Sequence, residues 1–124
     1  MAAGIFGQGA VPEIDATEAK QYIAEHGADS EFVLLDVRTA GEIEEAHIEG
    51  CLKLDITGGE FQRRMLHLDP QKDYLLVCRS GNRSGYAAAL MLNAGFRRAV
   101  NLRGGMLAWV RAGYPIETGG VDSA

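Results

Sequence analysis

Cysteine, histidine and proline are scarce in this sequence, and it contains no long hydrophobic run and no basic run. Its two cysteines lack Cys-x-x-Cys spacing, so we expect neither a disulfide framework nor a zinc site, and a reducing compartment such as the cytoplasm fits best. The three histidines are scattered and give no pattern of metal ligands. The first ten residues carry neither the positive charge nor the apolar length of a signal peptide or a membrane span.

Acidic side chains outnumber basic ones, which gives a formal net charge of −5 and a pI near 5.1. Because no basic run is present to neutralise phosphates, we expect neither nucleic acid nor a membrane surface as a partner. The glycine-containing segments match neither a dinucleotide fingerprint nor a P-loop, and a serine hydrolase elbow also fails. No cofactor is therefore expected.

The chain is long enough for one domain with a single sizeable core. Of its 124 residues, 47% are apolar and 23% are charged, which is typical of a soluble globular protein. We place the domain at residues 12–117 and find no interior linker that would divide it. Flexible segments are expected at 1–11 and 118–124, since both ends are rich in glycine and small residues.

Apolar runs of strand length alternate with segments of helical pattern. A first helix is expected to begin at a capping box formed by Asp15 and Glu18 and to end near His26. Gly95 is expected to cap a later helix. Strands are predicted at 32–37, 51–56, 74–77 and 99–102, and further helices at about 40–46, 60–68, 84–93 and 106–111. This alternation predicts an α/β fold with an open, mainly parallel sheet.

The segment after residue 77 carries the features of a reactive site. Cys78 stands where a buried strand ends and a short polar loop leads into a helix, and the loop consists of Arg79, Ser80, Gly81, Asn82 and Arg83. Backbone N–H groups of such a loop and of the helix N-terminus converge on one point and stabilise an anion there, which lowers the pKa of a thiol. Cys78 is therefore a candidate nucleophile, and Arg79 and Arg83 are candidate cations for substrate oxygens. The alternative is a buried cysteine that closes a core strand beside solvated arginines.

Asp36 and Arg38 are expected on the same rim as Cys78. Ligands of open α/β sheets bind beyond the carboxyl ends of the strands. Asp36 stands at the carboxyl end of the 32–37 strand, and Cys78 stands at that of the 74–77 strand. Asp36 would then hydrogen-bond loop N–H groups or pair with an arginine. Alternatively, the two residues only fix the turn from strand to helix. We assign them a supporting place and no catalytic one.

Several segments together resemble a single-domain rhodanese over roughly residues 12–117. They are Asp36-Val37-Arg38, Ala46-His47-Ile48-Glu49-Gly50, the Cys78 loop, Leu102-Arg103-Gly104-Gly105, Ala108-Trp109 and Gly113-Tyr114-Pro115. The resemblance implies a sheet of about five strands with helices on both faces. It also implies a thiosulfate-type sulfurtransferase in which Cys78 carries a persulfide, cradled by the N–H groups of Arg79 to Ser84. The expected partners are a small anionic sulfur donor and an acceptor such as cyanide, a thiol or a protein cysteine.

Other functions of related proteins stay open at this point. A persulfide-carrying or regulatory module with little turnover of thiosulfate is the main alternative. Related phosphatases and arsenate reductases place five residues between cysteine and arginine, whereas here four separate Cys78 from Arg83, and Ser84 holds the position of that arginine. Cys51 stands where the family usually has alanine, so we expect a small buried residue there. A resolving thiol for Cys78 is the alternative for this residue.

Overall fold

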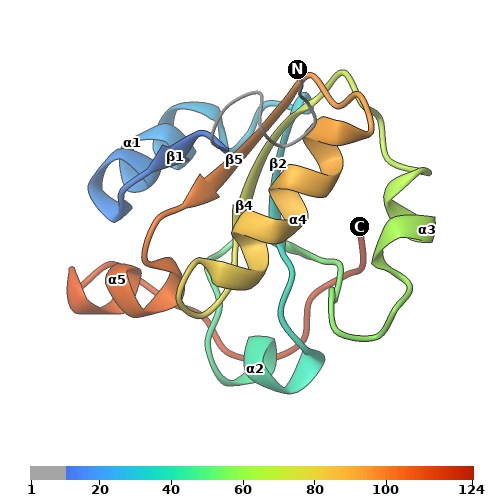
Figure 1. The fold of residues 1–124 in the computed structure, drawn as a ribbon. Helices are drawn as coiled ribbons and strands as arrows, with labels where there is room; N and C mark the ends of the chain where they lie inside the picture. The colour runs from blue at the N-terminus through green and yellow to red at the C-terminus, as the bar shows by residue number, and fades with distance from the viewer. Residues whose placement is uncertain (1–10) are drawn as a thin grey trace.

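The computed structural model describes residues 11–124, and its centre is a five-stranded sheet in which all neighbouring strands run parallel (Figure 1). The strands lie in the spatial order β1-β5-β4-β2-β3. Their bounds are Glu13–Ile14 for β1, Phe32–Asp36 for β2, Leu52–Lys53 for β3, Asp73–Val77 for β4 and Arg98–Leu102 for β5. The predicted α/β fold with an open parallel sheet is thus confirmed.

Five helices in the described part of the chain surround the sheet. They are α1 Ala16–His26, α2 Ala40–Glu45, α3 Phe61–Met65, α4 Asn82–Asn93 and α5 Gly105–Arg111. Helices α1 and α5 pack on one face of the sheet, and α3 and α4 pack on the other. Helix α2 lies at one end of the sheet, near the loop that connects β4 to α4 (Figure 1).

The two central strands are buried on both faces, which explains their continuous apolar sequence. Successive side chains of a strand point to opposite faces. Leu34 of β2 and Leu75 of β4 therefore join the core beneath α1 and α5. Their neighbours Leu35 and Leu76 join the core beneath α3 and α4, where both are 0% exposed. The sheet thus separates two apolar cores.

Some element boundaries differ from those expected. Strand β1 was not foreseen, because two residues are too short for a period-two pattern. Strand β3 covers only two residues of the predicted 51–56 segment. Helix α4 begins at Asn82 rather than at 84, since Gly81 takes a left-handed φ of 102° and the helix starts directly after it. At the other end of α4 the cap is Ala94, and Gly95 follows it with a φ of 97°.

The C-terminal segment 118–124, for which flexibility was expected, makes backbone contacts with the domain. The backbone of Lys53 in β3 donates to Asp122 O and accepts from Ala124 N, each at 2.9 Å. Gly119 N donates to Glu44 O at 2.9 Å, and Val121 packs against the core beneath α1 and α5. Backbone groups on the open side of β3 thus hold a segment whose composition alone gave no sign of order. Of the segment 1–11, only Val11 lies within the described residues, and it packs against the α3 and α4 core.

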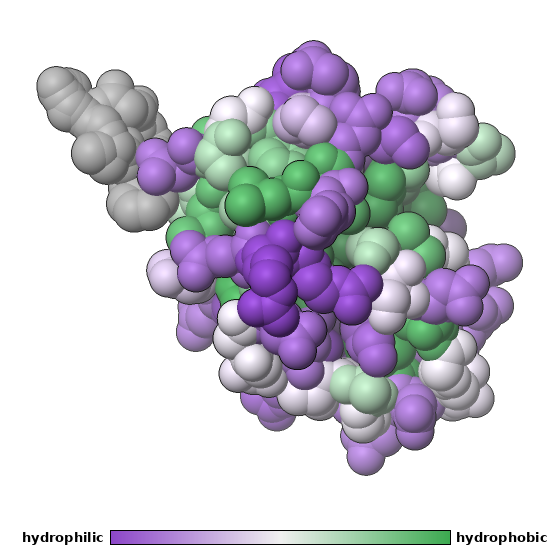
Figure 2. All heavy atoms as spheres, turned by 90° about the vertical axis from the view of Figure 1, so that its right-hand side faces the viewer, coloured by the Kyte–Doolittle hydropathy of each residue, from purple (hydrophilic) through white to green (hydrophobic). Residues whose placement is uncertain are grey.

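The surface on the α3 side has a mixed character. Hydrophilic and hydrophobic patches alternate over this face (Figure 2). Leu66, directly after α3, is 69% exposed, and Tyr86 of α4 is 60% exposed. Within residues 11–124, none of the helices combines the length and the apolar character needed to cross a lipid bilayer.

Candidate active site

The carboxyl ends of β2 and β4 form the rim on which the candidate residues meet. The two strands are neighbours, and Asp36 stands in register with Val77. Cys78 follows Val77 directly, so residues 42 positions apart in the sequence are brought to the same rim. The β4–α4 loop lies there next to α5, with α2 at the same end of the sheet (Figure 1).

The sulfur of Cys78 faces hydrogen-bond donors of its own loop. Gly81 N donates to Cys78 Sγ at 3.1 Å, and Ser84 Oγ lies 3.2 Å from the same sulfur. Gly81 is required at this place, because its φ of 102° is left-handed and a Cβ would lie 3.2 Å from Gly104 N. The turn brings the N-terminus of the twelve-residue helix α4 to the sulfur.

Helix α5 fixes the loop from the outside. Met106 N donates to Cys78 O at 2.8 Å, and Leu107 N donates to Arg79 O at 3.0 Å. The first N–H groups of α5, which have no partner within their own helix, are satisfied in this way. Because these loop carbonyls point toward α5, the following N–H groups are left on the side of the sulfur. Gly105 permits this approach, since a Cβ there would lie 2.4 Å from Cys78 O.

Two opposing effects act on the pKa of Cys78. Burial is the larger single effect and raises the pKa, since the residue is only 1% exposed. Hydrogen bonds from the Ser84 side chain and from the backbone N–H groups of Ser84, Gly81 and Ser80 together outweigh burial and lower the pKa below the ordinary value. The surroundings of Cys78 therefore favour the thiolate, which is the nucleophilic form.

Ser84 links the sulfur to a polar network inside the sheet. Its Oγ lies 2.6 Å from Asn101 Oδ1, while Asn101 Nδ2 donates to Gly81 O at 3.1 Å and to Glu13 Oε2 at 2.8 Å. A hydroxyl carries one proton, so Ser84 donates to Asn101 or to Cys78 Sγ but not to both at once. With a thiol the S–H can donate to Ser84 Oγ, whereas a thiolate takes the Ser84 proton. Sequence reasoning missed Asn101, although a buried amide within the apolar 99–102 run was a signal.

Arg83 is bound to a carboxylate of α2, which was not foreseen. Its Nη1 and Nη2 donate to Glu42 Oε1 and Oε2, both at 2.8 Å. These hydrogen bonds are the main reason why the pKa of Glu42 is lowered to about 2; burial opposes them, and contacts with Thr39 add to them. Both loop arginines were expected to be available for substrate oxygens, whereas here the guanidinium of Arg83 is paired with Glu42. Arg79 is exposed at the surface.

Asp36 and Arg38 bind each other. Arg38 Nε and Nη2 donate to Asp36 Oδ1 and Oδ2 at 2.9 and 2.7 Å, and the Arg38 backbone N–H donates to Oδ1 at 3.1 Å. Arg38 Nη2 also donates to Ala46 O at 2.7 Å, which ties the end of β2 to the end of α2. Both side chains are nearly fully buried. Asp36 thus pairs with an arginine, which is one of the expected contacts, and the same pair links the end of β2 to the end of α2, as expected of residues that fix the turn from strand to helix.

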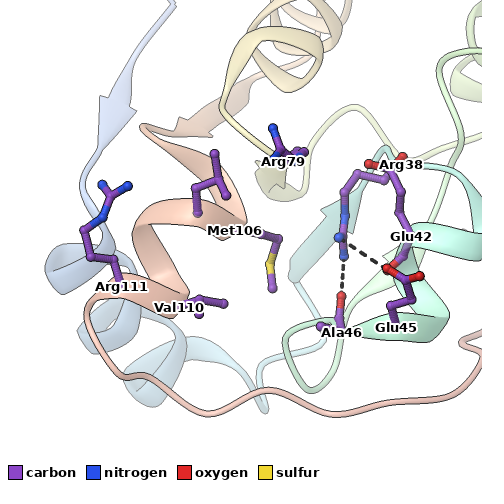
Figure 3. Close-up of a pocket in the computed structure, with 9 residues that line it drawn as sticks. Arg38, Glu42, Glu45, Ala46, Arg79, Met106, Val110 and Arg111 are labelled. Atoms are coloured by element: carbon purple, nitrogen blue, oxygen red, sulfur yellow. Dashed lines mark hydrogen bonds between the residues drawn. The ribbon is translucent and has the colours of Figure 1, made fainter.

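A pocket of about 360 Å³ opens between α2 and α5 beside the loop. Figure 3 shows Met106, Val110 and Arg111 on the α5 side, Glu42 and Glu45 on the α2 side, and Arg79 on the loop above them. The α5 wall carries apolar side chains and the α2 wall carries two carboxylates, while Arg79, the residue directly after Cys78, lines the pocket from the loop.

Cys51 lies apart from Cys78. It packs into the core beneath α1 and α5, whereas Cys78 belongs to the core on the opposite face of the sheet. Burial, and then the negative charge of Asp36, raise the pKa of Cys51 to about 12. Both cysteines are free thiols. These surroundings match the expected small buried residue rather than a resolving thiol.

Among residues 11–124, no group of three or more His, Cys, Asp or Glu side chains is arranged to hold a metal ion.

The comparison with known proteins agrees with the fold. The family profile of the rhodanese-like domain matches residues 15–112. A sulfurtransferase of Allochromatium vinosum is 40% identical over 107 residues, which are 86% of this chain and 94% of that protein. A putative sulfur carrier protein of Bacillus subtilis is 34% identical over 99 residues, which are 80% of this chain but only 51% of that protein.

Solved structures show the same architecture. The crystal structure of a rhodanese-related protein from Thermoplasma volcanium superposes with a TM-score of 0.73 and 25% identity, and the match covers 86% of this chain and 97% of that one. The resemblance expected from the sequence is confirmed by the family profile, by relatives and by this structure. The chain therefore belongs to the rhodanese-like domain family.

Proposed function

We propose that this protein is a sulfurtransferase that carries a sulfane sulfur as a persulfide on Cys78. The observation that carries this proposal is the contact of Cys78 Sγ with Gly81 N and Ser84 Oγ, at 3.1 and 3.2 Å. Donors so placed stabilise the Cys78 thiolate, which attacks the sulfur donor in the first step and is the leaving group when the sulfur is passed on. The free state of both cysteines fits a reducing compartment such as the cytoplasm.

The transfer proceeds in two displacement steps. In the first, the Cys78 thiolate attacks the outer sulfur of thiosulfate or a similar donor, a new S–S bond forms, and sulfite leaves with the electron pair of the broken S–S bond. In the second, cyanide, a thiolate or a protein cysteine attacks the outer sulfur of the persulfide, and the Cys78 thiolate leaves. The lowered pKa of Cys78 increases the fraction of thiolate that is ready to attack. Arg79 is the loop cation that supports binding of the donor's oxygens.

A persulfide carrier with little turnover of free thiosulfate is the second candidate. It is favoured by the Bacillus subtilis relative, a putative sulfur carrier protein of which this chain covers 51%. Both candidates use the same Cys78 persulfide and differ in whether thiosulfate is the donor.

Phosphatase or arsenate chemistry fits the loop less well. Ser84 stands where related phosphatases place their arginine, and here Ser84 is buried with its hydroxyl 3.2 Å from Cys78 Sγ. Arg83, the residue before it, is bound to Glu42. The loop thus supports binding of one sulfur atom better than that of a tetrahedral oxyanion.

The first test is the mass of the protein after incubation with thiosulfate. We expect one additional sulfur atom on the wild type and on Cys51→Ser, and none on Cys78→Ser, because only Cys78 lies against donors that stabilise its thiolate. Cys51→Ser is the matched control, since it removes the second buried thiol. An added sulfur that persists in Cys78→Ser would contradict the proposal.

Assays of the product separate the candidates. Thiocyanate formed from thiosulfate and cyanide, without phosphate release from an aryl phosphate, supports the thiosulfate sulfurtransferase. The carrier is supported if neither thiocyanate nor phosphate forms and if a protein persulfide or a low-molecular-weight persulfide still converts Cys78 to its persulfide. Phosphate release would overturn both.

A further inference from the structure

Glu42 connects helix α2 to Arg83 near Cys78, a contact that the chemistry of sulfur transfer does not by itself require. Its two carboxylate oxygens each accept one hydrogen bond from Arg83, at 2.8 Å. The two side chains are 30% and 31% exposed, so this ion pair lies at the mouth of the site and is only partly screened by water. Glu42 also lines the pocket beside the loop (Figure 3).

The position of Glu42 is fixed before any substrate arrives. Glu42 is the third residue of α2 and completes a capping box, in which Glu42 N donates to Thr39 Oγ1 at 3.3 Å and Thr39 N donates to Glu42 Oε1 at 3.2 Å. The carboxylate is therefore held by its own helix as well as by Arg83. With a pKa of about 2 it remains ionised at every physiological pH.

Arg83 directly precedes Ser84, whose hydroxyl lies 3.2 Å from Cys78 Sγ, so its charge lies near the reactive sulfur. The pKa of Arg83 is raised mainly by hydrogen bonds to Glu42, and the negative charges of Glu42 and of the Cys78 thiolate add to this. An unpaired guanidinium at the position of Arg83 would attract an anionic sulfur donor. In the ion pair, however, the positive charge of Arg83 is balanced by Glu42.

We propose that Glu42 is a specificity-determining residue that sets the charge of the sulfur donor. By neutralising Arg83, it leaves attraction of the donor to Arg79 and to the loop N–H groups. The site then gives a dianion such as thiosulfate a smaller advantage over neutral or singly charged sulfane donors, such as organic polysulfides and persulfides. This inference rests on the proposed sulfur transfer and adds the class of donor.

The test uses two alkylating reagents that differ in charge, because both react at Cys78 without any sulfur transfer. We compare the rates with iodoacetate, an anion, and iodoacetamide, which is neutral. Glu42→Gln keeps the shape of the side chain and its capping role. In this variant the ratio of the iodoacetate rate to the iodoacetamide rate should rise by about threefold at low ionic strength, because iodoacetate carries one negative charge. The corresponding gain for a dianion would be about tenfold. The rise should shrink in high salt.

A double variant and a control show where the effect arises. In Glu42→Gln combined with Arg83→Gln, both charges are gone, so the ratio should return to within about twofold of the wild type. Glu44→Gln removes an exposed carboxylate of the same helix that does not line the pocket, and it should leave the ratio unchanged. An equal rise in Glu44→Gln, or an unchanged ratio in Glu42→Gln, would overturn the inference.

Kinetics with donors complete the test. In Glu42→Gln, kcat/KM for thiosulfate should rise relative to kcat/KM for a neutral organic trisulfide, whereas a purely structural role would lower both equally. Equal changes for both donors would overturn the inference even if the alkylation ratio had moved. If no donor transfers sulfur to Cys78, the proposed function fails, and the alkylation ratio still reports on the charge that Glu42 sets.

Discussion

Cys78 is a buried thiol whose sulfur nevertheless lies against hydrogen-bond donors, and this combination controls its reactivity. Burial alone would keep the group protonated, as it does for Cys51. The difference between the two cysteines comes from the loop N–H groups and from Ser84. The hydroxyl of Ser84 is the one side-chain donor among them, and Asn101 competes for its proton.

Replacement of Ser84 by alanine should raise the pKa of Cys78. A depressed thiol pKa depends on hydrogen bonds to the thiolate, so the loss of one of them shifts the midpoint of reactivity to higher pH. At neutral pH the rate of alkylation by iodoacetamide should fall several-fold, while the limiting rate at high pH changes little. The measurement is the pH dependence of that rate.

Ser80→Ala is the matched control for this prediction. Ser80 is exposed and contributes to the pKa of Cys78 through its backbone N–H, which alanine retains. The pH midpoint of Cys78 alkylation in Ser80→Ala should stay at the wild-type value. An unshifted midpoint in Ser84→Ala would mean that the hydroxyl donates to Asn101 in both protonation states.

At the scale of elements, the loop depends on how closely α5 approaches it. Gly105 begins α5 with a φ of +56°, and a Cβ there would lie 2.4 Å from Cys78 O and 2.6 Å from the carbonyl carbon of Arg79. Both neighbours are backbone atoms that cannot rotate away. A side chain at position 105 would therefore push α5 and the loop apart, and the first N–H groups of α5 would lose their hydrogen bonds to the loop carbonyls.

Gly105→Ala should therefore lower both the stability and the reactivity of the protein. We expect the free energy of unfolding to fall by at least about 2 kcal/mol, since the change combines backbone strain with a clash. Alkylation of Cys78 should slow, because the loop has to move. Urea unfolding and the alkylation rate measure the two effects.

Gly113→Ala separates backbone strain from the clash. Gly113 follows α5 with a φ of +80°, but no atom lies within 4 Å of the place of its Cβ. This variant should lose about 1 kcal/mol and keep its reactivity. Equal losses in the two variants would show that the contact between α5 and the loop contributes nothing.

The elements that follow from the sequence are those with strong local patterns. The 32–37 and 74–77 runs are buried on both faces and lead directly to Asp36 and Cys78, so their strands and their common rim could be predicted. The ion pair of Arg83 with Glu42 could not, because it joins residues 41 positions apart and depends on how α2 sits at the end of the sheet. Strand β1 has no pattern of its own, and its two residues gain their place by pairing with β5.

At the scale of the whole molecule, residues 118–124 pack against the domain. Glycine and small polar residues predict a loose end, whereas three backbone hydrogen bonds and the side chain of Val121 bind the segment to α2, β3 and the core. Such long-range contacts leave no local pattern in the sequence.

Removal of residues 118–124 should lower stability and leave the site unchanged. We expect a loss of about 2 kcal/mol in the free energy of unfolding, since the truncation removes backbone hydrogen bonds together with a partly buried apolar side chain. Alkylation of Cys78 should proceed at the wild-type rate. The unfolding midpoint in urea measures the first effect, and an unchanged midpoint would restore the expectation of a flexible end.

The same segment has a consequence for contacts between molecules. Lys53 lies in β3, one of the two edge strands of the sheet. Asp122 and Ala124 bind the backbone groups that Lys53 would otherwise present to solvent. An uncovered outer strand is a template for strands of other molecules, which leads to aggregation. On the far side of the sheet, β1 is only two residues long and follows Pro12, which has no N–H to offer. We therefore expect the terminal residues to hinder the pairing of this edge with strands of other copies of the protein at high concentration.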